Sequence, residues 1–201
     1  MENIARVIYI NLDKRKDRKE HMETQSREYG LQNVERFDAI ECKEMGCIGC
    51  LQSFIAVLEL ARDRQYRNVL ILEDDFQFTL PKDQVYEQMT DIFAQQFDWD
   101  VMMLAYHLVN ASDAINGYTR LLNAQAGSAF IVQQHYYDKL IATWKDALPK
   151  LISTRAHWLY ASDQSWNSLL PVDLWYGVTR KLGKQMASFS DNALSYVEYD
   201  C

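Results

Sequence analysis

The sequence predicts an α/β domain with a mainly parallel sheet flanked by helices, and three observations lead to this prediction. Short apolar runs that are typical of buried strands alternate along the chain with longer segments of helical periodicity. One run, at residues 69–72, lies between polar residues and has the length of a strand buried on both faces. Three carboxylates, Glu73, Asp74 and Asp75, follow it directly, and ligands of α/β folds bind beyond such strand ends.

The other elements follow from local patterns of apolar and polar residues. Asp13 is the expected N-cap of the first, highly charged helix, because its carboxylate accepts hydrogen bonds from free N–H groups there. The polar segment 107–125 contains the turn pair Asn116-Gly117, which predicts a small hairpin. The expected strands are residues 7–10, 34–40, 69–72, 100–106, 127–132 and 172–176, and the expected helices are residues 14–28, 50–61, 83–96, 134–147 and 161–169.

The composition fits a single globular domain over residues 1–201, with 48% hydrophobic residues and no repeat or linker that would mark a boundary. The formal net charge of −7 argues against a surface that coats nucleic acid. No apolar run has the length of a transmembrane segment, and the first residues lack the apolar core of a signal peptide. We therefore expect a cytoplasmic protein, one that is peripheral at a membrane, or a domain of a longer protein.

Four cysteines allow two interpretations. Cys42, Cys47 and Cys50 have the C-x4-C-x2-C spacing of one kind of iron–sulfur site, and the last two form a CxxC pair. Cys50 also belongs to the apolar stripe of the helix at 50–61, and Cys201 is the last residue. Buried free thiols in a reducing compartment are therefore the preferred interpretation, ahead of a cluster or a zinc site.

The acidic run has the chemistry of a divalent metal site. Three adjacent negative charges repel one another, so such a run at the end of a strand needs a cation or solvent. Side chains two apart on an extended segment point the same way, so Glu73 and Asp75 can converge on one Mg²⁺ or Mn²⁺ ion. The alternative is a solvated acidic turn without a ligand.

Cations and glycines accompany the acidic run in positions that predict a nucleotide site. Arg15 and Arg18 share one helix face just beyond the first strand, where they can meet phosphates. Gly46 and Gly49 flank the start of a core helix, where a glycine permits close approach of backbone or ligand. If these groups meet at one edge of the sheet, they form a nucleotide-binding site; a solvated basic helix face is the alternative for the arginines.

Three motifs and a weaker fourth occur in order along residues 7 to 191. They are Tyr9-Ile10-Asn11-Leu12-Asp13-x-Arg15-x-x-Arg18, Gly46-x-x-Gly49-Cys50-x-x-Ser53, Leu70-Ile71-Leu72-Glu73-Asp74-Asp75, and Leu182-Gly183-Lys184-Gln185 followed by Ser188-Phe189-Ser190-Asp191. In this order they resemble glycosyltransferase family 25, which includes bacterial lipooligosaccharide glycosyltransferases and the collagen galactosyltransferases. The resemblance implies a GT-A-type, Rossmann-like fold, a nucleotide sugar such as a UDP-hexose as donor, a divalent metal, and inverting transfer to a glycan, lipooligosaccharide or glycoprotein hydroxyl.

The resemblance also implies roles for individual residues. Glu73 and Asp75 are assigned to the metal, with Asp191 added by a tail that folds back over the donor site and orders with the ligand. Asp163, at the start of a late helix, is assigned as the general base, with a plain N-cap as the alternative. The candidate donor-site residues are Asn11, Leu12, Arg15, Arg18, Gly49, Ser53, Asp74 and Gln185.

Some features leave other functions open. The family commonly has Ser-His where this chain has Ser53-Phe54, although Phe54 also fits the core stripe of its helix. This departure leaves a non-catalytic module that binds glycan or nucleotide as one alternative. The other is a metal-dependent phosphohydrolase, because an acidic strand end with Mg²⁺ fits that chemistry too. Four aromatic residues are candidates for stacking on a sugar acceptor: Trp158, Trp166, Trp175 and Tyr176.

Overall fold

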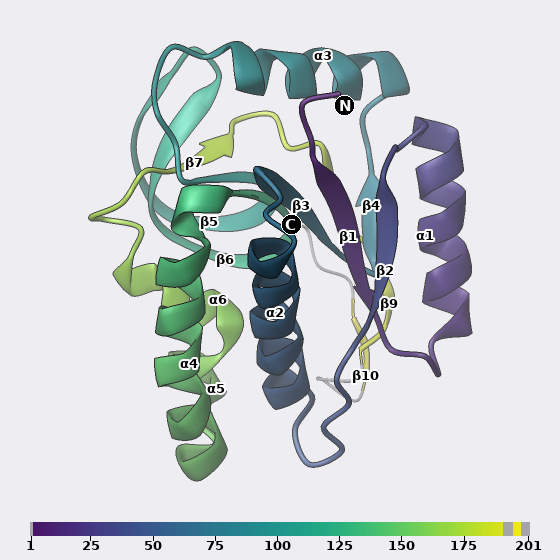
Figure 1. Cartoon of the computed structure of the whole chain (residues 1–201), viewed down its shortest axis with the longest axis vertical. Helices are drawn as coiled ribbons and strands as arrows, with labels where there is room; N and C mark the ends of the chain where they lie inside the picture. Colours follow the sequence, from purple (N-terminus) through teal and green to yellow (C-terminus); the bar gives the residue numbers. More distant parts are fainter. Residues whose placement is uncertain (1, 191–194, 198–201) are drawn as a thin grey trace.

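The computed structural model describes residues 2–190 and 195–197, which form three layers with a sheet between two sets of helices (Figure 1). In spatial order the strands of the main sheet are β2 (Val34–Asp38), β1 (Arg6–Asn11), β3 (Asn68–Glu73), β6 (Tyr118–Gln133), β5 (Val101–Ile115) and β7 (Trp175–Val178). Strand β6 runs antiparallel to both of its neighbours β3 and β5, and the other five strands share one direction. The expected mainly parallel α/β sheet is therefore confirmed.

Helices cover both faces of this sheet. They are α1 (Lys16–Tyr29), α2 (Gly46–Asp63), α3 (Lys82–Ala94), α4 (Tyr137–Thr154), α5 (His157–Tyr160) and α6 (Ser162–Ser165), with 3₁₀ turns at Gln134–Tyr136 and Trp166–Ser168. The core beneath α2 and α4 contains the buried side chains of Phe54 and Trp144, whose ring centroids are 5.5 Å apart. The opposite core contains Met22 of α1 and Val85 of α3. Among the described residues, no helix has both the length and the hydrophobicity that crossing a bilayer requires.

The first three strands end at the same edge of the sheet. Strands β1 and β3 are parallel neighbours, with Ile10 opposite Glu73, and β1 is also parallel to β2, with Asn11 opposite Asp38. Because parallel strands carry their carboxyl ends to one edge, the polar residues after all three strands lie together. This edge is at the lower end of the sheet in Figure 1.

Two local predictions are wrong because local signals were outweighed by longer hydrogen-bonded structure. The small hairpin expected within 107–125 is the tip of one long hairpin, in which β5 and β6 continue through the turn at Asn116 and Gly117. Asp13 does not cap α1: the N–H of Arg15 donates to the carbonyl of Leu12 at 2.8 Å, and the helix starts one residue later. Asp13 pairs instead with the Lys16 ammonium at 2.7 Å. Other bounds differ as well: the helix expected at 134–147 continues to Thr154, and the strand expected at 172–176 is Trp175–Val178.

The chain after β7 also contains strands that its polar composition did not predict. Strand β8 (Gly183–Gln185) pairs antiparallel with β4 (Phe76–Phe78), the short strand that follows the acidic run. Strands β9 (Ser188–Ser190) and β10 (Ser195–Val197) pair with each other. The β4–β8 pairing places the start of the tail directly beside the acidic run. The tail residue Asp191 lies outside the described residues.

Candidate functional site

The acidic run lies where β3 ends and the chain turns into β4. Glu73 is the last residue of β3, and Asp74 and Asp75 form the turn that follows. The side chains of Asp74 and Asp75 are largely buried, with about a tenth of each exposed (9% and 11%), so the run is not a solvated surface turn. The alternative of a solvated acidic turn is therefore wrong for Asp74 and Asp75.

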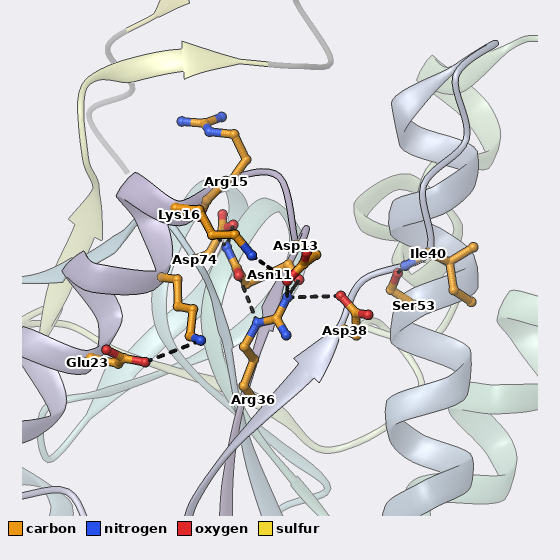
Figure 2. A network of polar contacts seen from close by, with 11 residues as sticks. Asn11, Asp13, Arg15, Lys16, Glu23, Arg36, Asp38, Ile40, Ser53 and Asp74 are labelled. Atoms are coloured by element: carbon orange, nitrogen blue, oxygen red, sulfur yellow. Dashed lines mark hydrogen bonds and ion pairs between the residues drawn. The ribbon is translucent and has the colours of Figure 1, made fainter.

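Asp74 is held from two sides by residues of the first motif. The Asn11 side-chain amide donates from Nδ2 to Asp74 Oδ2 at 2.7 Å, and Arg18 donates from Nη1 to Asp74 Oδ1 at 2.7 Å. The same Arg18 nitrogen lies 3.1 Å from Asp75 Oδ2, so one guanidinium serves both aspartates. Residues from β1, α1 and the end of β3, up to 63 positions apart in the sequence, meet in this network (Figure 2 shows Asn11 and Asp74).

Glu73 and Asp75 converge on a single atom. The Gln185 amide of β8 points its Nε2 at both carboxylates, 2.8 Å from Glu73 Oε2 and 3.4 Å from Asp75 Oδ1. The two carboxylates thus share one hydrogen-bond donor, and their convergence on a metal ion stays a prediction. The point where they meet holds a donor with partial positive charge.

The electrostatics of the run follow from its burial and its charge. Burial is the largest cause that raises the pKa of Glu73 well above its ordinary value, and the charges of Asp75, Asp74 and Asp163 raise it further. Burial also raises the pKa of Asp75, against the opposing effect of the Arg18 cation. Glu73 and Asp75 therefore hold their protons more tightly than isolated carboxyl groups do, and the Arg18 cation opposes this effect in both.

Arg15 and Leu12 lie at the turn beside this network. Among the contacts described, they take part through their backbone carbonyls and not, as Asn11 and Arg18 do, through side-chain bonds to the aspartates. The guanidinium of Arg15 pairs with Asp17 at 2.8 Å, and in Figure 2 it points away from Asn11 and Asp74. The Arg15 carbonyl, however, accepts a hydrogen bond from Asn11 Nδ2 at 3.1 Å. Leu12 supplies the carbonyl that starts the turn. Both residues therefore shape the loop that carries Asn11 and Arg18.

Gly49 and Ser53 fasten the loop between β2 and α2 to the helix. The Ser53 hydroxyl donates to the Gly49 carbonyl at 2.7 Å and accepts from the Ile40 N–H at 2.8 Å, and its side chain is fully buried. A Cβ at position 49 would lie 2.2 Å from the Ile40 carbonyl oxygen, so only glycine fits there. The contacts described for these two residues are structural ones that set the position of the loop.

Asp163 lies on the α2 side of the sheet, near the acidic run. Its Oδ2 accepts a hydrogen bond at 3.0 Å from the N–H of Ala126, a β6 residue whose φ of 48° is in the left-handed region. The N-cap of α6 is Ala161, so the alternative that Asp163 caps this helix is wrong. The charge of Asp163 raises the pKa of Glu73, which shows that the two carboxylates are within electrostatic reach of each other.

Several other residues at positions that the sequence suggested for substrate binding are part of the hydrophobic core. Phe54 is buried against Phe130, with ring centroids 5.7 Å apart, so the departure from Ser-His fills the core. Trp166 and Trp175 are fully buried, so they cannot stack on an acceptor, whereas Trp158 is 62% exposed.

The cysteines Cys42, Cys47 and Cys50 are free thiols, and burial raises the pKa of Cys50 well above its ordinary value. In the described part of the chain, no three His, Cys, Asp or Glu side chains are grouped as a metal cage. A cysteine-bound cluster or zinc site is therefore not formed by these three residues.

The acidic run nevertheless matches part of a metal site. Glu73 and Asp75 offer hard carboxylate oxygens that meet at one point, which suits Mg²⁺ or Mn²⁺. Two protein carboxylates do not complete an octahedral shell, and Mg²⁺ in nucleotide sites keeps waters and takes phosphate oxygens as its remaining ligands. The residues thus fit an ion that arrives with a diphosphate rather than one held by protein alone.

Sequence reasoning missed Arg36, which bonds to Asn11 from β2. Its Nε donates to Asn11 Oδ1 at 2.9 Å, and its side chain is 22% exposed. In the sequence, Arg36 is one of the polar residues of an alternating strand, which is the usual pattern for a solvated side chain. Only the parallel pairing of β1 and β2 brings it next to the first motif.

Comparison with known proteins identifies the fold. No protein-family model and no curated protein matches the chain. Among solved structures it is similar to a glycosyltransferase involved in the glycosylation of the major capsid of PBCV-1, with a TM-score of 0.58, 11% identity, and coverage of 95% of this chain and 96% of that one. The chain is also similar to the glycosyltransferase GlyE of Streptococcus pneumoniae TIGR4, with a lower TM-score of 0.48 and 11% identity. That match covers 88% of this chain and 45% of the GlyE chain.

The chain therefore has the fold of a glycosyltransferase, and the expected GT-A-type architecture is confirmed. Membership of glycosyltransferase family 25 in particular stays a prediction, because no family model matches.

Proposed function

We propose that this protein is a glycosyltransferase that moves a hexose from a nucleotide sugar, a UDP-hexose, to a hydroxyl of a glycan, lipooligosaccharide or glycoprotein. The observation that carries the proposal is the convergence of Glu73, Asp74 and Asp75 with Asn11 and Arg18 at the carboxyl edge of the sheet. That edge is where α/β folds bind nucleotides, and the fold is the one found in a solved glycosyltransferase.

Each part of the network has a role in donor binding. Arg18 is a cation at the acidic run, placed where it can exchange a carboxylate for a diphosphate oxygen, since guanidinium binds both bidentately. Asn11 fixes the Asp74 carboxylate, whose oxygens are the acceptors proposed for sugar or ribose hydroxyls. Gln185 brings the start of the tail against the same carboxylates.

A divalent ion, Mn²⁺ or Mg²⁺, would be held by Glu73 and Asp75, and Asp191 is the further carboxylate proposed from the sequence. When bound, such an ion supplies Lewis-acid stabilisation of the charge on the departing diphosphate. The protein's own contribution is to gather the carboxylates and exclude solvent around them. The carboxylates of Glu73 and Asp75, once ionised, would provide the attraction for the ion.

Asp163 is the proposed general base of an inverting transfer, which forms a β-linkage. Its Oδ2 is fixed by the Ala126 N–H, which leaves Oδ1 to accept the proton of the acceptor hydroxyl. The contribution of Asp163 to the raised pKa of Glu73 supports a position for this base close to the acidic run. Trp158, exposed on α5 just before α6, is the aromatic side chain proposed to stack on the acceptor. Tyr176, the other candidate, packs against Phe97 with ring centroids 4.6 Å apart, beside the core on the opposite face of the sheet.

The test is turnover of nucleotide sugars, followed by anomeric proton NMR, with and without a panel of glycan and glycoprotein acceptors. The proposal expects release of UDP and a β-linked product that depend on the acceptor. A metal-dependent phosphohydrolase, the second candidate for an acidic strand end, would release phosphate or sugar at the same rate without any acceptor. A binding module would show no turnover in either condition.

A further inference from the structure

The guanidinium of Arg36 spans the end of β1 and contacts Asn11 twice. Arg36 Nε donates to Asn11 Oδ1 at 2.9 Å, and Nη2 donates to the Asn11 backbone carbonyl at 3.2 Å. Figure 2 shows Arg36 rising from β2 toward the Asn11 side chain. One rigid fork thus holds both the main chain and the side chain of a residue at the proposed donor site.

These contacts decide which way the Asn11 amide points. Because Oδ1 is taken by Arg36, Nδ2 faces the other side, where it donates to Asp74 Oδ2 at 2.7 Å and to the Arg15 carbonyl at 3.1 Å. A flipped amide would set its N–H groups against the guanidinium and its oxygen against the Asp74 carboxylate. Both contacts would be repulsive, and Asn11 is 1% exposed, so water cannot relieve them.

Arg36 is itself held from outside. Its Nη2 donates to Asp38 Oδ1 at 2.9 Å and lies 3.5 Å from Asp13 Oδ1, and both of these carboxylates are more than 60% exposed. The exposed carboxylates of Asp38 and Asp13 keep the Arg36 guanidinium over the end of β1. The buried Asn11 amide, fixed in this way, donates its hydrogen bond to Asp74. The chain of contacts runs from the surface through β2 and β1 to the acidic run on β3.

We propose that Arg36 is a positioning residue of the donor site: it sets the orientation of the Asn11 amide and, through it, of the Asp74 carboxylate. The proposal rests on the proposed function for its effect on donor binding, but not for its effect on Asn11. Lysine cannot take the place of Arg36, because a single ammonium lacks the planar fork that reaches Oδ1 and the backbone carbonyl together.

The first experiment tests the orientation without any ligand. The side-chain NH₂ signals of Asn11, assigned by their loss in Asn11→Asp, are recorded by ¹H–¹⁵N NMR in wild type and in Arg36→Gln. Arg64→Gln is the matched control, because Arg64 also pairs with a β2 carboxylate, Glu35 at 2.8 Å, outside this network. The expected result is a changed shift and faster hydrogen exchange of the Asn11 NH₂ in Arg36→Gln and no change in Arg64→Gln. Unchanged Asn11 signals in Arg36→Gln would overturn the proposal.

The second experiment measures the affinity for UDP with Mn²⁺ by calorimetry, together with the KM for the donor where turnover is found. Loss of a residue that orients a site group typically costs about 10- to 100-fold in affinity or activity. We expect a loss of this size in Arg36→Gln and in Arg36→Lys, in KM far more than in kcat, and wild-type affinity in Arg64→Gln. Wild-type affinity in both Arg36 variants, or an equal loss in Arg64→Gln, would contradict the proposal. If wild type itself binds no nucleotide, the proposed function fails and the Asn11 signals alone decide the role of Arg36.

Discussion

Glu73 is the residue at which the proposed function and the stability of the fold oppose each other. Its pKa is raised in the folded protein, so the folded state holds this proton more tightly than the unfolded chain does, and ionisation of Glu73 weakens the fold. The contribution of protonated Glu73 to the unfolding free energy is therefore complete below the ordinary carboxyl pKa. This contribution is lost as the pH rises through the raised pKa of Glu73. In EDTA, Glu73→Gln is expected to have a higher unfolding free energy than wild type, by an amount that grows between pH 5 and pH 8.

Urea denaturation across this pH range measures the difference. Asp63→Asn is the control, because Asp63 is an exposed carboxylate on α2 that pairs only with Arg62 among the contacts described. A stability gap that is the same at pH 5 and pH 8, or one that favours wild type, would show that Glu73 is not strained by its surroundings.

Asp163 can be tested with two substitutions that separate its contacts. Asparagine keeps an oxygen that accepts the Ala126 N–H bond, and alanine does not. If Asp163 is the general base, Asp163→Asn lowers kcat by about 10²- to 10⁴-fold, with donor affinity and melting temperature near those of wild type. Asp163→Ala is expected to lose the same activity and also to melt earlier. Full activity in Asp163→Asn would show that Asp163 is not the general base and that its role is the structural hydrogen bond to Ala126 of β6.

At the scale of elements, the loop between β2 and α2 depends on one buried hydroxyl. Ser53→Ala leaves the Ile40 N–H without its acceptor, which is expected to lower the unfolding free energy by about 1–3 kcal/mol. Ser26→Ala is the control, because among the described residues the Ser26 hydroxyl makes a single hydrogen bond, to the carbonyl of Met22 four residues earlier. Urea denaturation compares the two, and equal losses would mean that the loop is held by other contacts.

The short helix α5 offers a separate test of acceptor binding. Trp158 is 62% exposed and precedes α6, so Trp158→Ala is expected to raise the KM for the acceptor and to leave the melting temperature and UDP affinity unchanged. Base–aromatic stacking energies set the scale for such contacts at about 1–3 kcal/mol, or roughly 5- to 150-fold in affinity. Val172→Ala removes another exposed apolar side chain, just before β7, and should change none of these values. An equal effect in both variants would remove Trp158 from the acceptor site.

For the whole molecule, the sequence predicted the features that depend on neighbouring residues. The apolar run before Glu73 and the adjacent carboxylates predicted the end of β3 and its chemistry, because strand and turn preferences are local. Arg36 and the β4–β8 pair were missed, since their partners lie 25 residues and more away and only the sheet register brings them together. The fold of the whole chain was predicted by the alternation of strands and helices, which survives errors of a few residues at each boundary.

The central claim is that the carboxyl edge of this sheet binds a nucleotide sugar with a divalent ion. The direct measurement is the melting temperature with a panel of nucleotide sugars, in Mn²⁺ and in EDTA, for wild type and Asp75→Asn. A ligand at a hundred times its Kd stabilises the native state by about 2.7 kcal/mol, or roughly 5 to 10 °C for a chain of this size. We expect such a shift for a UDP-hexose with Mn²⁺, a smaller one in EDTA, and no Mn²⁺-dependent difference in Asp75→Asn. The same shift in EDTA as in Mn²⁺, or no shift with any nucleotide sugar, would contradict it.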